Sequence, residues 1–225
     1  MTNEQWQAIL LSLQVAAIST VISLPFAIFA AWLLTKSRGI VRVILDTVIN
    51  LPLVLPPVVT GYLLLVSFGR NGLFGKWLYE TLGLEFVFDF KGAVLAAAIV
   101  SFPLMVRAVR LAFDSVDRRL IQAAKTLGKK PWSTFWQITV PLSRRGLIAG
   151  CMLAFARSLG EFGATIMVAG NIAGETKTIP LFVYDQLQAG GIGTCWPVIV
   201  FSIVIAMLAL LISSRFEFPS PEVTE

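Results

Sequence analysis

The sequence contains no histidine and only two cysteines, and 14% of its 225 residues are charged. Without histidine, the chain lacks the commonest metal ligand and the side chain best suited to general base catalysis near neutral pH. Cys151 and Cys195 are too few to form a disulfide framework or a thiolate metal site. A soluble domain carries about 25% charged residues. We therefore expect an integral membrane protein that is not an enzyme and that binds no metal or cofactor itself.

The abundant residues are apolar: 56% of the chain is hydrophobic and the mean hydropathy is +0.80. A bilayer core of about 30 Å is crossed by about 20 helical residues. Backbone groups in lipid must be hydrogen-bonded within their own segment, and the sequence shows no alternating strand pattern. We predict an all-α polytopic membrane protein, a single domain over residues 1–225, with about five transmembrane helices. The predicted spans are Ile9–Thr35, Val43–Phe68, Gly92–Phe113, Gly146–Gly170 and Pro197–Ser214.

The positions of lysine and arginine predict the orientation, because these residues concentrate in cytoplasmic loops. Thirteen of the 18 basic residues lie in the first and third connectors, at their margins, or in the C-terminal tail. This bias places the N-terminus outside and the C-terminus in the cytoplasm. It also accounts for the net charge of +5, so no nucleic-acid partner is needed.

The third connector, residues 114–144, is a basic and amphipathic loop in an otherwise apolar chain. Asp114 and Asp117 resemble a capping box that starts a helix. Gly128 suits the left-handed position that stops it, and Pro131 suits the first turn of a second short helix, which Pro141 would end. The loop is therefore predicted to form a helix, a tight turn and a second helix.

One face of the first loop helix is apolar, because its members are spaced at i, i+3, i+4 and i+7. Two of the four are alanines, which would let another protein approach the backbone closely. The same periodicity is typical of a helix that lies on the membrane surface, and periodicity alone leaves both interpretations open. The face consists of Leu120, Ala123, Ala124 and Leu127.

The second span contains three prolines near its middle, Pro52, Pro56 and Pro57. Each removes a backbone donor and disturbs the preceding helical turn. Such breaks are tolerated in membranes where the freed groups face protein or a water-filled cavity, and broken helices line substrate sites in transporters. We favour a translocation pathway here over a kink that serves packing alone.

The fourth span contains two charges, Arg157 and Glu161, which are four residues apart and can meet on one helical face. Charged residues inside a membrane usually face the protein interior or a cavity. The pair either fixes this helix in the structure or places Arg157 beside the path of an anion. Both interpretations stay open. Gly146, Gly150 and Ala154, also four apart, predict close packing against a neighbouring helix.

The spacing of the third connector resembles a known signature. Gln122-Ala123-Ala124, then Gly128, then Ile138-Thr139-Val140-Pro141 is similar to the "EAA…G…I-LP" motif of bacterial ABC importer membrane subunits, with nine residues between Gly128 and Ile138. Gln122 replaces the usual Glu, and Val140 replaces the usual Leu. The resemblance implies that this helix docks into a groove of a separate ATPase subunit. The implied coupling residues are Gln122, Ala123, Ala124, Lys125, Thr126, Leu127 and Gly128.

Three further stretches resemble the molybdate branch of the molybdate/sulfate importer family: "LPLVLPPVVTGYLLLVSFGRNGLFG", "FARSLGEFGAT" and "GNIAGETKTIP". The resemblance implies a type I ABC importer fold and a homodimer in the bacterial inner membrane. It also implies two cytoplasmic ATPase subunits that bind ATP and Mg²⁺, and a periplasmic protein that delivers molybdate. Tungstate and sulfate are the alternative substrates. The expected translocation pathway comprises Pro52, Pro56, Pro57, Arg157, Glu161 and Thr165.

The outer loops carry weaker signals. Residues 73–82 are amphipathic and predict a short helix at the membrane interface, while Asn171–Trp196 could face a partner or water. "GRNGLFGKW" is not a phosphate-binding loop, because Arg70 stands where the motif needs its first glycine and Trp77 follows the lysine. A secondary transporter would typically need internal repeats and ion-coupling residues at the midplane. A purely structural membrane protein is the other alternative.

Overall fold

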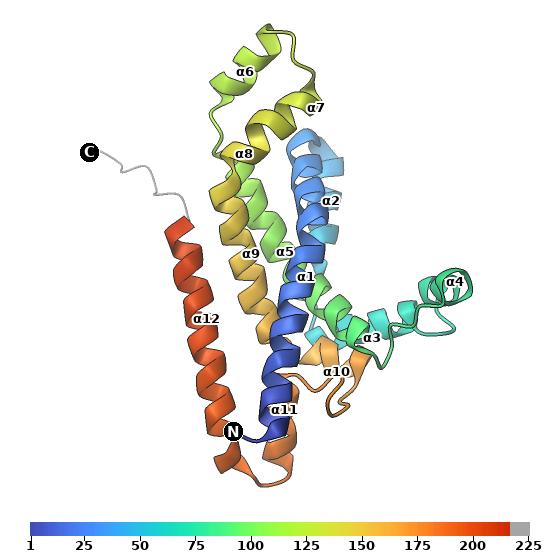
Figure 1. The fold of residues 1–225 in the computed structure, drawn as a ribbon. Coiled ribbons are helices and arrows are strands. Elements are labelled where there is room, and N and C mark those ends of the chain that lie inside the picture. Colours follow the sequence, from blue (N-terminus) through green and yellow to red (C-terminus); the bar gives the residue numbers. More distant parts are fainter. Residues whose placement is uncertain (217–225) are drawn as a thin grey trace.

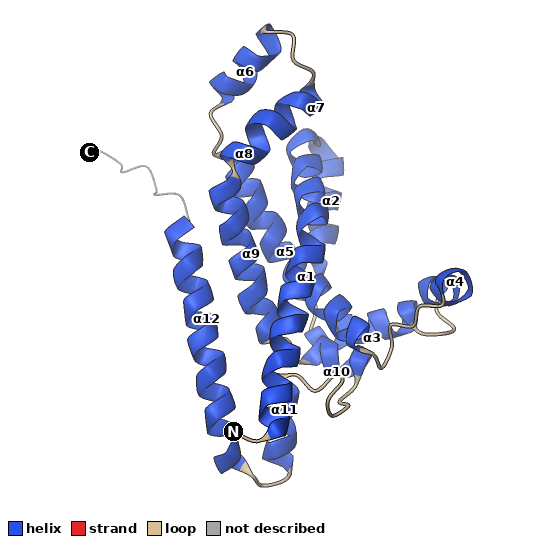
Figure 2. Ribbon diagram, viewed as in Figure 1, coloured by secondary structure: helices blue, strands red, loops and turns tan. Residues whose placement is uncertain are grey.

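The computed structural model describes residues 1–216, and within that range every regular element is a helix (Figures 1 and 2). In chain order the helices are α1 (Asn3–Lys36), α2 (Gly39–Val54), α3 (Pro57–Phe68), α4 (Leu73–Leu82), α5 (Phe90–Asp114), α6 (Arg118–Thr126), α7 (Pro131–Thr134), a π turn (Phe135–Thr139), α8 (Val140–Leu142), α9 (Arg144–Leu159), α10 (Gly163–Ala169), α11 (Ile179–Gln188), a 3₁₀ turn (Ile192–Cys195) and α12 (Trp196–Phe216). The predicted all-α fold is confirmed.

The centre of the molecule is a bundle of α1, α5 and α9 (Figure 1). Its main buried cluster combines alanines of α1 with larger side chains of α5, such as Met105 and Val109. Gly150 of α9 lies against Ala108 of α5, where an added Cβ would be 3.0 Å from the alanine Cβ. Small residues let helix backbones approach closely where lipid supplies no hydrophobic drive. The predicted packing role of Gly150 is therefore confirmed.

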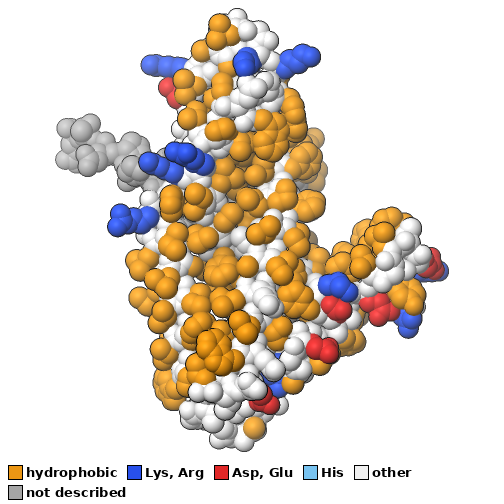
Figure 3. Space-filling model, viewed as in Figure 1, with side chains coloured by type: hydrophobic (Ala, Val, Ile, Leu, Met, Phe, Trp, Pro, Cys, Tyr) orange, Lys and Arg blue, Asp and Glu red, His pale blue; other side chains and the backbone are white. Residues whose placement is uncertain are grey.

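Helix α12 runs along the outside of α9 and turns most of its apolar side chains outward (Figures 1 and 3). Three helices, α1, α5 and the segment Gly193–Phe216, are long and apolar enough to cross a membrane by themselves. Two further spans are possible if each strongly bent helix pair crosses as one unit. The structure thus agrees with a polytopic protein of three to five spans.

The second predicted span is divided by its prolines. Helices α2 and α3 meet at an angle of 110° with the break at Leu55 and Pro56. Pro56 has no N–H to donate, and Pro57 occupies the first position of α3, where the missing donor costs nothing. Pro52 lies inside α2 without ending it. The predicted break is confirmed, but it is a sharp corner and not a kink in a continuous helix.

The fourth predicted span, Gly146–Gly170, is wrong as a single helix. Helix α9 ends at Leu159, and α10 begins only at Gly163. The side chain of Glu161 accepts a hydrogen bond from the backbone N–H of Ala164 at 2.9 Å, which supplies a cap for the new helix. The helical pair that is apolar enough to form a span is instead Pro131–Leu142 with α9, bent by 69°.

The connections gather at two ends of the bundle. Helices α6, α7 and α8 form one end, where basic side chains are prominent on the visible surface, and α11 and the N-terminus lie at the other (Figures 1 and 3). Helix α4 projects sideways from the bundle and has the predicted bounds, 73–82. Arg70, which precedes α4, donates a hydrogen bond to the hydroxyl of Tyr79 within α4 at 3.0 Å. This hydrogen bond raises the pKa of Arg70.

Candidate functional site

Helix α6 forms the tip of the basic end and carries most of the predicted coupling residues (Figure 1). Its cap is Asp117, whose carboxylate accepts from the backbone N–H of Arg119 at 2.8 Å. The predicted pairing of Asp114 with Asp117 in one capping box is wrong, because Asp114 is the last residue of α5. The cap of α6 therefore lies three residues later than Asp114, and the helix starts at Arg118 with a single side-chain cap.

The C-terminus of α6 has the geometry that the glycine predicts. Gly128 adopts φ +77°, in the left-handed region. The N–H of Lys129 donates to the carbonyl of Ala124, and the N–H of Gly128 donates to the carbonyl of Lys125, both at 3.0 Å. These two bonds form a Schellman motif, which satisfies the last carbonyls of a helix. The predicted role of Gly128 as the stop of this helix is confirmed.

The predicted apolar face of α6 is directed mainly away from the rest of the chain. Only Ala124 is buried, while Leu120 and Ala123 are exposed and Leu127 is 82% exposed. The other members of the coupling set, Gln122, Lys125, Thr126 and Gly128, are exposed as well. Helix α6 therefore presents small and apolar side chains at the far tip of the molecule without a partner from the described chain.

An aromatic cluster anchors this tip to the bundle. The Phe135 ring is buried, 5.4 Å from Phe113 of α5 and 6.2 Å from Trp32 of α1, measured between ring centroids. Trp132 stands against the same two rings, Phe135 and Trp32. Aromatic rings in edge-to-face and stacked contacts such as these add attraction beyond the area they bury. The cluster thereby fixes α7 and the π turn against α1 and α5.

The second half of the loop differs from the prediction in one respect. Pro131 starts α7 as predicted, but Pro141 does not end the second helix, which runs on through a π turn to Leu142. Pro141 is the second residue of α8, in the first turn, where a helix tolerates a missing donor. The chain turns at Ser143, whose buried hydroxyl donates to the carbonyl of Ala112 at 3.0 Å.

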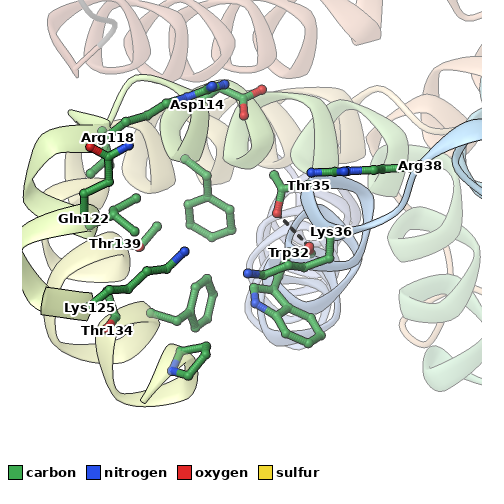
Figure 4. Close-up of a pocket in the computed structure, with 15 residues that line it drawn as sticks. Trp32, Thr35, Lys36, Arg38, Asp114, Arg118, Gln122, Lys125, Thr134 and Thr139 are labelled. Carbon is green, nitrogen blue, oxygen red and sulfur yellow. Dashed lines mark hydrogen bonds between the residues drawn. The ribbon is translucent and has the colours of Figure 1, made fainter. Parts of the chain in front are cut away.

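A polar pocket of about 390 Å³ lies beneath α6, between that helix, the C-terminal end of α1 and the end of α5 (Figure 4). Gln122 and Lys125 line it from α6, Lys36 lines it from the end of α1, and Arg38 lines it from the α1–α2 connection. The sequence analysis missed this pocket, because it joins residues that are more than 80 positions apart. One feature of the sequence pointed to such a pocket: its basic residues place the first and the third connector on the same side of the membrane.

The two helix breaks, at Leu55–Pro56 and at Gly160–Phe162, lie next to each other. A Cβ placed on Gly163 would be 2.9 Å from the Cβ of Pro57, so α10 starts in direct contact with the start of α3. Further along, a Cβ on Gly61 would be 2.8 Å from the Cα of Ala164. Glycine on both helices thus permits a contact between backbones. Pro52 is not part of this contact, since it belongs to α2, which packs on the α1–α5–α9 cluster.

The predicted pairing of Arg157 with Glu161 is confirmed. The guanidinium nitrogen Nη1 lies 2.8 Å from Oε2 of Glu161, whose side chain is 3% exposed. The other carboxylate oxygen of Glu161 caps α10, as described above. The ion pair therefore links the end of α9 to the start of α10 across the break. The side chain of Arg157 remains about one third exposed. Thr165, the last predicted pathway residue, is buried within α10.

The architecture and these motifs agree with comparisons to known proteins. Residues 23–218 match the family described as "Binding-protein-dependent transport system inner membrane component". The chain is 55% identical over 214 residues to the Molybdenum transport system permease protein ModB of Escherichia coli (strain K12), covering 95% of this chain and 93% of that protein. It is 54% identical over 207 residues to the protein of the same name from Haemophilus influenzae, covering 92% and 90%.

The fold also has a counterpart among solved structures. A chain of a bacterial alginate ABC transporter, crystallised with a periplasmic protein that holds an alginate pentasaccharide, superposes with a TM-score of 0.73 and 16% identity, covering 96% of this chain and 78% of that one. At this identity the likeness concerns the fold. The family match over most of the chain, with the 55% identity to the Escherichia coli protein, shows that this protein belongs to the binding-protein-dependent transport system inner membrane components.

Proposed function

We propose that this chain is the membrane-spanning subunit of an ATP-driven importer of molybdate, with tungstate as a second substrate. The assignment of the substrate depends on one observation: the chain is 55% identical, over 95% of its length, to a permease named for molybdenum transport. Two copies of the chain would form the translocation path between them. The chain itself would perform no covalent chemistry; ATP and Mg²⁺ would be bound by two separate ATPase subunits.

Coupling to those ATPases is assigned to α6, over residues 122–128. The helix stands at the tip of the basic end with exposed Ala123 and Leu127, which suits insertion into a groove of another protein. Its distal position, beyond α7 and α8, supports docking over an alternative in which it lies along the membrane surface (Figure 1). The aromatic cluster around Phe135 would pass a displacement of α6 on to α1 and α5.

The path for the anion is assigned to the adjoining breaks of α2–α3 and α9–α10. Pro56, Pro57 and the Arg157–Glu161 pair lie at these breaks, and Pro52 and Thr165 lie on the helices that flank them. Because Glu161 neutralises Arg157 at short range, the site would hold an anion weakly. Weak binding favours release once the binding protein has delivered its load. Alternation between inward-open and outward-open states would be a rigid-body population shift driven by closure of the ATPases.

The orientation follows from the basic end of the molecule. We place α6 and the C-terminal end of α12 in the cytoplasm and the N-terminus with α11 outside, in the inner membrane of a bacterial cell. This placement follows the positive-inside rule. A periplasmic binding protein would then dock on the outer segments 69–91 and 171–196, which include α4 and α11.

Reconstitution tests this proposal. The chain is placed in proteoliposomes with its ATPase, the binding protein and ATP, and accumulated molybdenum is counted. We expect uptake that requires ATP and is suppressed by tungstate at similar concentration and by sulfate only in large excess. Uptake driven by a proton or sodium gradient without the ATPase would contradict the proposed mechanism, and equal competition by sulfate would contradict the proposed substrate.

A further inference from the structure

Two hollows of different character meet below α6. The first is the polar pocket described above. The second, which we call the inner groove, has a volume of about 250 Å³ and lies between Leu24, Ile28 and Trp32 of α1 and Trp132, Phe135 and Trp136 of the loop. Trp32 and Phe135 line both hollows, so the polar pocket and the apolar groove adjoin at these two rings.

The polar pocket carries an excess of positive charge. Lys36, Arg38, Arg118 and Lys125 line it, and within residues 1–216 none of these four takes part in an ion pair. Asp114 is the carboxylate in the lining, and its charge is shared with Arg110, 3.9 Å away. Figure 4 shows Lys36 and Lys125 reaching into the pocket from opposite sides. The pocket therefore suits an anionic group.

The inner groove, in contrast, is lined by hydrocarbon and aromatic side chains, and it lies on the apolar flank of the bundle. Trp132 is 59% exposed and Trp136 is 46% exposed. Tryptophan is enriched where the hydrocarbon of a membrane meets water. A small inorganic anion would use the pocket and leave the groove empty, whereas a molecule with an anionic head and a hydrocarbon tail would fill both.

We propose that this composite site binds an anionic phospholipid of the adjacent membrane leaflet. The phosphate occupies the basic pocket, and one acyl chain lies in the inner groove. Basic pockets at the cytoplasmic ends of membrane helices bind lipid headgroups of this class. Because Lys36 belongs to α1 and Lys125 to α6, the bound lipid bridges these two helices. It thereby holds α6 at a fixed distance from the bundle. An acidic segment of the ATPase would match the pocket alone, so the groove favours the lipid.

The test uses the purified full-length chain in detergent, with phosphatidylglycerol or phosphatidylcholine added, and native mass spectrometry to count retained lipids. We expect retention of phosphatidylglycerol over phosphatidylcholine. The combined variant Lys36→Gln, Arg38→Gln, Arg118→Gln should weaken that retention roughly a hundredfold, given the attraction of three basic groups to an anionic lipid. Arg119→Gln is the matched control, since Arg119 is adjacent on α6 but lies outside the pocket; it should retain the lipid.

A second variant separates the two parts of the site. Trp132→Ala with Trp136→Ala removes groove walls and keeps the charges, and it should also weaken retention of phosphatidylglycerol. Equal retention of both lipids, or unchanged retention in the triple variant, would overturn the proposal. So would displacement of the lipid by excess inorganic phosphate, which would identify a free anion as the ligand. Loss of the lipid on adding the ATPase subunit would assign the surface to that protein instead.

Discussion

Gly61 lies inside α3 beside the helix breaks, and Gly128 ends α6; each glycine is needed for a different reason. At Gly61 the backbone is helical, but there is no space for a side chain, because an added Cβ would lie 2.8 Å from a backbone atom of α10. At Gly128 space is abundant, with no atom within 4 Å of an added Cβ, but φ is +77°. The helix breaks are thus a packed region formed within the chain, whereas the α6 tip is an exposed surface. We propose that the ATPase contacts this surface.

The largest loss of stability is expected from a substitution at Gly61, where there is no space for a side chain. Gly61→Val should drive α3 and α10 apart and cost about 3 kcal/mol or more, the upper range for overpacking, because the obstacle is backbone and not a flexible side chain. Folded yield and thermal unfolding in detergent measure the loss. Gly160→Ala is the control, since its nearest neighbouring atom is 4.0 Å away and its φ is −92°. Equal stability of the two variants would show that the contact between α3 and α10 is not tight.

At the α6 tip the expected loss is one of coupling and not of folding. Ala123→Glu and Gly128→Asp place a carboxylate on the surface assigned to the ATPase, and both should abolish uptake or ATPase association without preventing membrane insertion. Gly128→Asn has the shape of Asp without the charge and tolerates the left-handed conformation; it should retain more uptake than Gly128→Asp. Normal uptake by both charged variants would refute the coupling role.

Removing the charge of Arg157 should destabilise the protein more than removing the charge of Glu161. Arg157→Gln leaves a buried carboxylate without its cation and should cost about 2 kcal/mol, below the ~3–5 kcal/mol of a fully buried pair, because Arg157 is partly exposed. Glu161→Gln should cost less, since the amide oxygen still caps α10 and the freed cation reaches water. Thermal unfolding compares the two. If Arg157 also meets the anion, Glu161→Gln will lower the molybdate concentration at half-maximal uptake; an unchanged value would leave the pair a purely structural one.

The smallest effect concerns the start of α6. Asp117→Ala removes the side-chain cap and should destabilise this helix locally by about 1 kcal/mol. Hydrogen exchange of the α6 amides should accelerate while exchange in α5 is unchanged. Asp117→Asn, which can still accept the Arg119 N–H, should restore most of the protection. Faster exchange throughout α5 in the Asp117→Ala variant would contradict the separation of tip and bundle.

Several helix boundaries could be predicted from local sequence alone. The stop at Gly128, the start at Pro131 and the bounds of α4 depend on neighbouring residues in the chain, and each is as expected. The break at Pro56 was foreseeable for the same reason. Asp114 was misassigned because either of two nearby aspartates could serve as a cap, and the length of α5 decides between them.

Long-range packing determined what the sequence could not reveal. The end of α9 at Leu159 has no proline to mark it; the break depends on the carboxylate of Glu161 turning back to cap α10. The contact of Pro57 with Gly163 and the pocket shared by Lys36 and Lys125 each join residues about 90 or more positions apart. Periodicity in a single sequence does not encode such distances, although the paired glycines hint at close packing.

The coupling role of α6 is tested most directly by finding which part of the molecule contacts the ATPase. A photo-cross-linking amino acid is placed at Thr126 on α6 or, as the control, at Thr81 on α4, since both positions are exposed. Each full-length variant is illuminated in membranes with the ATPase and the binding protein present. We expect ATPase adducts from position 126 and none from position 81. Absence of adducts at 126, or equal capture at both positions, would contradict the claim that α6 is where ATP hydrolysis acts on this subunit.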